Sequence, residues 1–268
     1  MLAYGGCTAL DVARAAAVGK ELVVIPASIA TAGISVDKSI LNYDGEDRSE
    51  RTMAPSRVIV SLTDMLGTDH AILDRLSRSG FGDYFASISA SIDVQYRAGD
   101  LSMDAVRRNV PENFKAVEWV CDEFSGYDEE CMRQLATYAH NYSLGVISGG
   151  DGTPRVGGEH KLYYQMMAQH DRYRGAAHKP THGELVATGI LVACKLLGEA
   201  TGDTSLYDDM RTAYGRLGLP TDYADLSAIG IERADLVKGL EAITDTDTYL
   251  GAHFSQGDYA VLDRVFVG

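Results

Sequence analysis

T-H-G-E at Thr181–Glu184 is a short polar segment that stands directly before apolar residues at helical spacing. Those apolar residues are Leu185, Gly189, Val192 and Leu196. Their period predicts an amphipathic helix that begins at the polar segment and carries His182 at its start. A histidine at the start of a helix is either an ordinary structural residue of the helix terminus or a ligand. The other polar segments of the chain help to distinguish these two interpretations.

Two further polar segments stand at predicted helix starts. G-G-E-H at Gly157–His160 follows a Gly-rich loop and opens a helix. G-F-G-D at Gly80–Asp83 combines a glycine break with a carboxylate that begins the next helix. The chain therefore offers Asp83, His160 and His182 at three predicted helix starts.

These three side chains suit a divalent metal. Two neutral imidazoles and one carboxylate on separate rigid helices form a three-ligand set for zinc, with an open position for water or a substrate oxygen. Other divalent ions are alternatives. Each residue also has a plainer interpretation, since Asp83 can cap a helix and both histidines can be structural residues at helix starts.

The first part of the chain alternates strands and helices, whereas the remainder shows only helical spacing. The elements predicted for the first part are a short strand into Gly5 and Gly6, a helix over Leu10–Val18, a strand at Leu22–Ile25, a polar hairpin-like segment around Asp44, and a strand at Arg57–Leu62. We therefore predict an α/β domain over residues 1–66 and a larger all-helical domain over residues 67–268.

The amino-acid composition indicates which class of molecule the protein binds. The 268 residues carry a formal net charge of −14. This excess of carboxylates argues against a nucleic acid or an anionic membrane, because both need clustered Lys and Arg, and it favours a small molecule. The four cysteines have no spacing typical of a zinc ribbon or a disulfide framework. Because neither a signal peptide nor a long apolar run is found, we expect a cytoplasmic protein.

The three polar segments occur in the order and approximate spacing seen in glycerol-1-phosphate and glycerol dehydrogenases, and dehydroquinate synthases share the H-G-E element. G-G-C-T-A-L-D at Gly5–Asp11 resembles the Gly-rich pyrophosphate loop of the same superfamily. The resemblance implies a remnant of a Rossmann-like nucleotide-binding domain, followed by a dehydroquinate synthase-like all-α metal domain. It also implies that Asp83, His160 and His182 bind the metal, because these residues match the family's ligands.

The same resemblance implies NAD or NADP as cofactor. The residues proposed to bind it are Gly5, Gly6, Thr8, Asp11 and Ser28. A Gly-rich loop before a helix offers backbone N–H groups to a pyrophosphate, but an ordinary strand-to-helix turn is the alternative. Family members carry further strand–helix units before this loop. We therefore expect a homo-oligomer, or a partner chain that supplies that half, because exposed strand edges are usually covered.

The sequence departs from the family at several positions. Iron-dependent alcohol dehydrogenases place a histidine where this chain has Ser87, which favours a zinc site of three protein ligands. Ala32 stands where the family has a substrate-contacting Asp. Tyr164 replaces a family histidine and lies four residues after His160, on the same helix face. We assign Tyr164 to substrate binding or weak acid catalysis, with core packing as the alternative.

The loop before His182 contributes one more candidate. His178 is interpreted as a proton shuttle, with Lys179 beside it as an anion contact, although both can be ordinary loop residues. The resemblance implies an oxidoreductase that acts on a hydroxyl or carbonyl of a small polyol or sugar phosphate. Two alternatives stay open. One is a zinc-dependent sugar-phosphate cyclase or lyase without a bound dinucleotide, and the other is a non-catalytic subunit.

Overall fold

The computed structural model describes residues 1–268 except 45, 149–155, 169–178, 244–246 and 267–268. The chain forms two compact units. The first consists of Met1–Tyr84 and Ser125–Gly152, and the second of Phe85–Phe124 and Thr153–Gly268.

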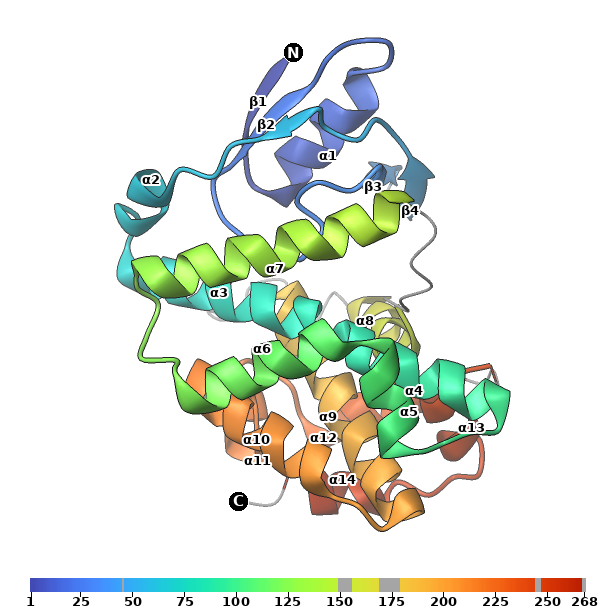
Figure 1. The fold of residues 1–268 in the computed structure, drawn as a ribbon. Coiled ribbons are helices and arrows are strands. Elements are labelled where there is room, and N and C mark those ends of the chain that lie inside the picture. The colour runs from blue at the N-terminus through green and yellow to red at the C-terminus, as the bar shows by residue number, and fades with distance from the viewer. Residues whose placement is uncertain (45, 149–155, 169–178, 244–246, 267–268) are drawn as a thin grey trace. The chain divides into compact units, whose positions relative to one another are not determined.

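The helices and strands of both units are labelled in Figure 1. The first unit holds β1 (Leu2–Gly5), α1 (Cys7–Ala16), β2 (Val23–Pro26), β3 (Lys38–Tyr43), β4 (Glu46–Arg51), β5 (Arg57–Val58), α2 (Leu62–Leu66), α3 (His70–Tyr84) and α7 (Glu129–Ser148). The second holds α4 (Ala86–Ala98), α5 (Met103–Asn109), α6 (Pro111–Asp122), α8 (Gly158–Ala168), α9 (His182–Thr201), α10 (Ser205–Leu217), α11 (Tyr223–Ala228), α12 (Arg233–Glu241), α13 (Tyr249–Phe254) and α14 (Ala260–Val265).

A parallel sheet in the order β1-β2-β5 forms the α/β part of the first unit. Parallel neighbours need a crossover connection, and α1 provides it between β1 and β2. Leu10 on α1 packs with Leu22 and Val24 in a small apolar core. The predicted strand–helix–strand start of the chain is thus confirmed.

The segment around Asp44 is the predicted hairpin. β3 and β4 pair antiparallel, with Tyr43 opposite Glu46. Asp44 adopts a φ of 53°, a left-handed conformation that Asp tolerates better than most residues. The predicted strand at Arg57–Leu62 was too long. β5 ends at Val58, and Ser61 instead caps α2, since its Oγ accepts from the backbone N–H of Asp64 at 3.3 Å.

The predicted glycine break before Asp83 was wrong. Helix α3 continues through Gly80 and Gly82, so Asp83 lies in its last turn and not at a helix start. Gly80 instead allows the backbone of Ile29 to lie close to α3, because a Cβ at Gly80 would lie 2.0 Å from the carbonyl oxygen of Ile29. A helical glycine can therefore report packing as well as a turn, and the sequence pattern does not separate the two.

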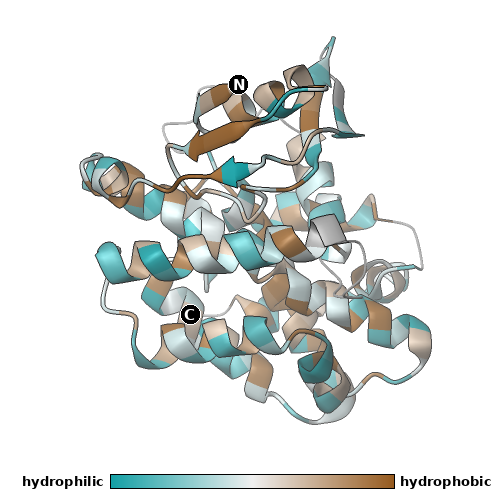
Figure 2. Ribbon diagram, turned by 45° about the horizontal axis from the view of Figure 1, so that its top comes forward, coloured by the Kyte–Doolittle hydropathy of each residue, from teal (hydrophilic) through white to brown (hydrophobic). Residues whose placement is uncertain are grey.

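The second unit is built around α9. Its residues from Gly183 to Cys194 are buried, and α4, α8, α10 and α14 pack against it. Hydrophilic and hydrophobic residues alternate along the surrounding helices, as amphipathic helices require (Figure 2). No helix among the described residues is long and apolar enough to cross a membrane.

All strands of the described chain lie before residue 66, and the regular elements described after it are helices. The first compact unit, however, also includes α3 and α7. The division into domains at residue 66 stays a prediction.

Candidate functional site

His182 is the first residue of α9, as predicted. Thr181 and Glu184 form a capping box: the Thr181 Oγ1 accepts from the Glu184 N–H at 3.4 Å, and the Thr181 N–H donates to Glu184 Oε2 at 2.7 Å. This reciprocal pair satisfies two N–H groups that a helix start leaves without helical partners. The T-H-G-E segment thereby fixes the position of the His182 backbone.

His160 lies in the first turn of α8 and is 6% exposed. Its Nδ1 is 2.7 Å from Oε1 of Glu159, whose side chain is completely buried. Glu159 also accepts from the backbone N–H of Gly157 at 2.8 Å and from the Ser89 hydroxyl at 2.6 Å. The Glu159 carboxylate thus fixes the His160 imidazole, and hydrogen bonds to both of its oxygens fix the carboxylate in turn.

The structure brings His160 and His182 of the second unit together. Their ring centroids are 5.2 Å apart, and each offers a ligand nitrogen within 4.8 Å of the other. The ring of Tyr163 lies edge-on to His182, with 4.3 Å between centroids. Two imidazoles at this separation can share one metal ion, since each metal–nitrogen bond is about 2 Å long.

The start of α8 is anchored by a buried carboxylate of α4. Oδ2 of Asp93 accepts from the Gly158 N–H at 2.8 Å, and Oδ1 accepts from the Tyr249 N–H at 2.6 Å. Burial raises the pKa of Asp93 to about 6, although the two N–H groups act in the opposite direction. Asp93 therefore ties α4, α8 and α13 together next to the histidines.

Asp83 belongs to the first unit and is 6% exposed. Its Oδ2 accepts from the backbone N–H of Ala32 at 2.7 Å. In the same part of α3, the Ser79 hydroxyl donates to the Ala30 carbonyl at 2.8 Å. Helix α3 thus holds the loop around residues 29–32, and Ala32 takes part in it through its backbone.

Gly5 and Gly6 form the strand-to-helix turn that the sequence predicted. Gly5 has a φ of 154°, and a Cβ there would lie 2.7 Å from that of Ala9. Gly6 is the N-cap of α1, on which Thr8 lies, and a Cβ on Gly6 would meet nothing within 4 Å. Ser28 follows β2 and is partly buried. Their role in cofactor binding stays a prediction.

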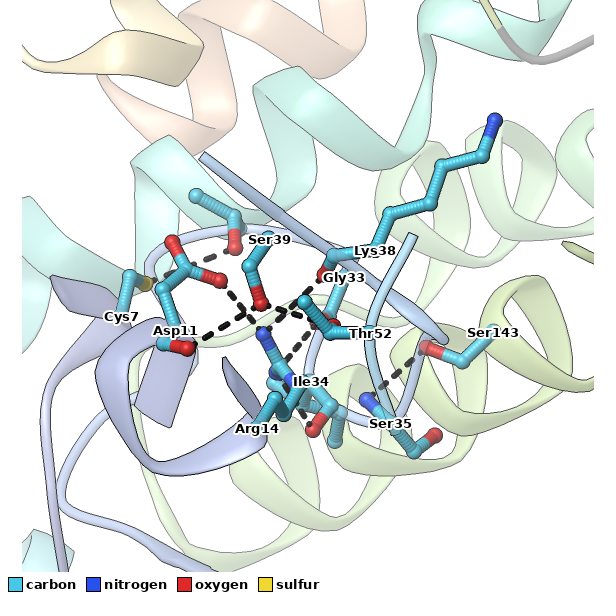
Figure 3. A network of polar contacts seen from close by, with 11 residues as sticks. Cys7, Asp11, Arg14, Gly33, Ile34, Ser35, Lys38, Ser39, Thr52 and Ser143 are labelled. Atoms are coloured by element: carbon cyan, nitrogen blue, oxygen red, sulfur yellow. Dashed lines mark hydrogen bonds and ion pairs between the residues drawn. The ribbon is translucent and has the colours of Figure 1, made fainter. Parts of the chain in front are cut away.

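Asp11 is engaged in an ion pair. Arg14, which is 3% exposed, donates to Asp11 Oδ1 at 2.6 Å and to the carbonyls of Gly33 and Ile34 at 3.0 and 3.1 Å. Figure 3 shows Arg14 at the centre of these contacts. Burial raises the pKa of Asp11 and lowers that of Arg14. Asp11 therefore positions Arg14 and, through it, the loop after β2.

Of the two predicted catalytic residues, the structure describes Tyr164. This residue is 46% exposed, and its ring is 5.1 Å from that of Tyr163. His178 lies outside the described residues. Lys179 is exposed, and Ser87 is buried on α4. The roles proposed for Tyr164 and His178 stay predictions.

The sequence analysis missed Glu159, Tyr163 and Asp93. Glu159 stands in G-G-E-H directly before a candidate ligand, and this place in the sequence was the signal that could have identified it. Asp93 gave no such signal, because its partners Gly158 and Tyr249 are 65 and 156 residues away in sequence.

No protein-family model matches the sequence. The chain is 27% identical over 264 residues to a glycerol-1-phosphate dehydrogenase (NAD(P)+) of Pyrobaculum neutrophilum, with 92% of this chain and 69% of the relative covered. It is 24% identical over 233 residues to an enzyme of the same name from Methanothrix thermoacetophila, with 85% of this chain and 61% of the relative covered. A substantial part of each relative thus lies outside the match.

Solved structures show the same fold. A probable glycerol dehydrogenase from Sinorhizobium meliloti 1021 has a TM-score of 0.60 at 18% identity, over 94% of this chain and 70% of the other. Glycerol dehydrogenase from Schizosaccharomyces pombe has a TM-score of 0.60 at 17% identity, over 98% and 68%. An iron-containing alcohol dehydrogenase from Corynebacterium glutamicum ATCC 13032 has a TM-score of 0.59 at 14% identity, over 100% and 73%. The chain is therefore similar in sequence to glycerol-1-phosphate dehydrogenases, and it has the fold of the glycerol dehydrogenases and of the iron-containing alcohol dehydrogenase.

Proposed function

We propose that this chain acts in a metal-dependent, NAD(P)-dependent dehydrogenase that oxidises a hydroxyl or reduces a carbonyl of a small polyol or polyol phosphate. The observation that carries the proposal is the pair His160 and His182, which offer ligand nitrogens within 4.8 Å of one another at two helix starts. The similarity to glycerol-1-phosphate dehydrogenases supports the substrate class.

Asp83 is the proposed third ligand, and zinc is the proposed metal. Two imidazoles and a carboxylate fit zinc with an open position, and Ser87 offers no fourth imidazole. Asp83 supplies a buried carboxylate at the end of α3, two residues before the second unit begins at Phe85. The donor set also accommodates other divalent ions, so metal identity is part of the test.

A bound metal would polarise the substrate oxygen, and a nicotinamide cofactor would exchange the hydride. The chain's own residues would position these groups. Gly5 and Gly6 would offer backbone N–H groups to the pyrophosphate at the start of α1. Thr8 and Asp11 on α1, and Ser28 after β2, are the other proposed cofactor residues. Tyr164 would hydrogen-bond the substrate, and His178 would exchange a proton with it.

A cyclase or lyase acting on a sugar phosphate is the second candidate. The observation that favours it is Ala32, which contributes only its backbone N–H to Asp83 and has no polar side chain for a substrate. Such an enzyme would use the metal without a tightly held dinucleotide. We also propose that a second copy of the chain, or a partner chain, contributes cofactor contacts.

The test combines metal analysis with nucleotide binding on the purified full chain. We expect about one zinc per chain by mass spectrometry and saturable fluorescence changes with NADH or NADPH. Zinc without nucleotide binding would instead favour the second candidate. A protein without metal after growth and dialysis in zinc would contradict both.

A further inference from the structure

The carboxylate of Glu159 is completely buried between Ser89, Gly157 and His160. We propose that Glu159 is a positioning residue that holds His160 as the Nδ1–H tautomer and directs its Nε2 lone pair to the metal. The inference rests on the proposed metal site and adds a residue that does not itself bind the ion.

Both oxygens of the Glu159 carboxylate have hydrogen-bond partners. Oε1 accepts from the Gly157 N–H at 2.8 Å and faces His160 Nδ1 at 2.7 Å, while Oε2 accepts from the Ser89 hydroxyl at 2.6 Å. Because Oε1 already accepts from the Gly157 N–H, we assign the imidazole nitrogen that faces it as a donor. With the proton on Nδ1, a neutral His160 carries its lone pair on Nε2.

The placement of Glu159 matches what a metal-binding histidine requires. Histidine ligands usually donate their second ring N–H to a carboxylate or carbonyl, which fixes the ring and makes the ligating nitrogen more basic. A buried carboxylate is costly unless it is paired, and the Glu159 charge has a natural counterpart in a cation bound by His160.

Glu159→Gln tests the charge with little change of shape. The amide oxygen can accept from Gly157 and His160, and the amide NH2 can face Ser89, whose hydroxyl has a second acceptor in the Ala86 carbonyl at 3.1 Å. The variant should therefore fold. Glu159→Leu removes the acceptor altogether.

Glu184→Gln is the matched control. Glu184 is also a buried carboxylate in a first helical turn, two residues after His182, and its Oε2 accepts from the backbone N–H and the hydroxyl of Thr181. Glutamine serves in this capping position as glutamate does. The control loses the same charge at a similar place but has a capping role.

The measurement is the zinc dissociation constant of the full chain by chelator competition. We expect Glu159→Gln and Glu159→Leu to bind zinc about 10- to 100-fold more weakly than wild type, and Glu184→Gln to stay within about twofold. Equal affinity of wild type and both Glu159 variants would overturn the inference and leave the metal site standing. A wild-type chain that binds no zinc would overturn the proposed function and, with it, the role of Glu159.

A second readout separates positioning from stability. In metal-free protein at a pH where the imidazole is neutral, nitrogen NMR should show His160 of the wild type as the Nδ1–H tautomer. Glu159→Leu should lose that preference, because the acceptor is gone. An unchanged tautomer in this variant would contradict the proposal even where zinc affinity falls.

Discussion

Gly189 of α9 lies directly against Glu159 of α8: a Cβ at Gly189 would be 2.8 Å from the Cα and 2.9 Å from the Cβ of Glu159. The glycine is what lets the two histidine-bearing helices approach so closely. Gly189 lies about two helical turns after His182. The spacing of His160 and His182 therefore depends on the absence of a side chain at Gly189, which faces the residue next to His160.

Gly189→Ala should separate α8 from α9. We expect a loss of about 1–3 kcal/mol in the free energy of unfolding, typical of an overpacked core, and weaker zinc binding. Gly215→Ala is the control, since a Cβ on this glycine of α10 would meet nothing within 4 Å and alanine favours a helix. Urea unfolding and chelator competition measure both effects. A Gly189→Ala protein as stable as wild type would show that the helices can yield.

His182→Ala should lower the metal content while keeping most of the helical circular dichroism. The imidazole is only partly buried, and the Thr181–Glu184 capping box remains in the variant. Asp83→Asn should also lower the metal content, because an amide is a weaker ligand than a carboxylate. Metal analysis of the two variants after dialysis checks these expectations. Wild-type stoichiometry in both variants would contradict the proposed ligand set.

Asp93 should make stability depend on pH. Its pKa is about 6 in the folded chain against an ordinary value of 3.8, so the folded state holds the proton more tightly. The stabilisation from the protonated form is present below about pH 4 and is lost as the pH rises through 6, amounting to about 3 kcal/mol. Urea unfolding of wild type and Asp93→Asn across this pH window isolates the part of the pH dependence of the unfolding free energy that comes from Asp93. Parallel pH profiles would show that Asp93 titrates normally.

Gly6→Ala should weaken nucleotide binding without unfolding the chain. A Cβ there meets no atom of the protein within 4 Å, and φ is −78°, which alanine adopts readily. It would stand where we propose that the pyrophosphate approaches the backbone. We expect about tenfold weaker NADH or NADPH binding, equivalent to about 1.4 kcal/mol. Unchanged affinity alongside measurable binding by the wild type would place the nucleotide elsewhere.

Local patterns predicted much of the fold. The T-H-G-E segment specified the start of α9 because a capping box needs only residues three apart. The strand–helix–strand start and the hairpin at Asp44 also follow from short-range chemistry. The error at Gly80 shows the limit, because the close approach of Ile29 is made by a segment about fifty residues earlier, which no local pattern records.

The sequence by itself determined which side chains are available to bind a metal. It also determined that two of these residues, His160 and His182, lie at the starts of helices. Tertiary structure decided which groups surround them. Ser89 reaches Glu159 across 70 residues of sequence, and Asp93 reaches the Gly158 N–H across 65. The packing of whole helices determines which residues become such partners, and this packing depends on all the contacts that a helix makes. Helix capping and hydrophobic periodicity, in contrast, depend only on neighbours along the chain.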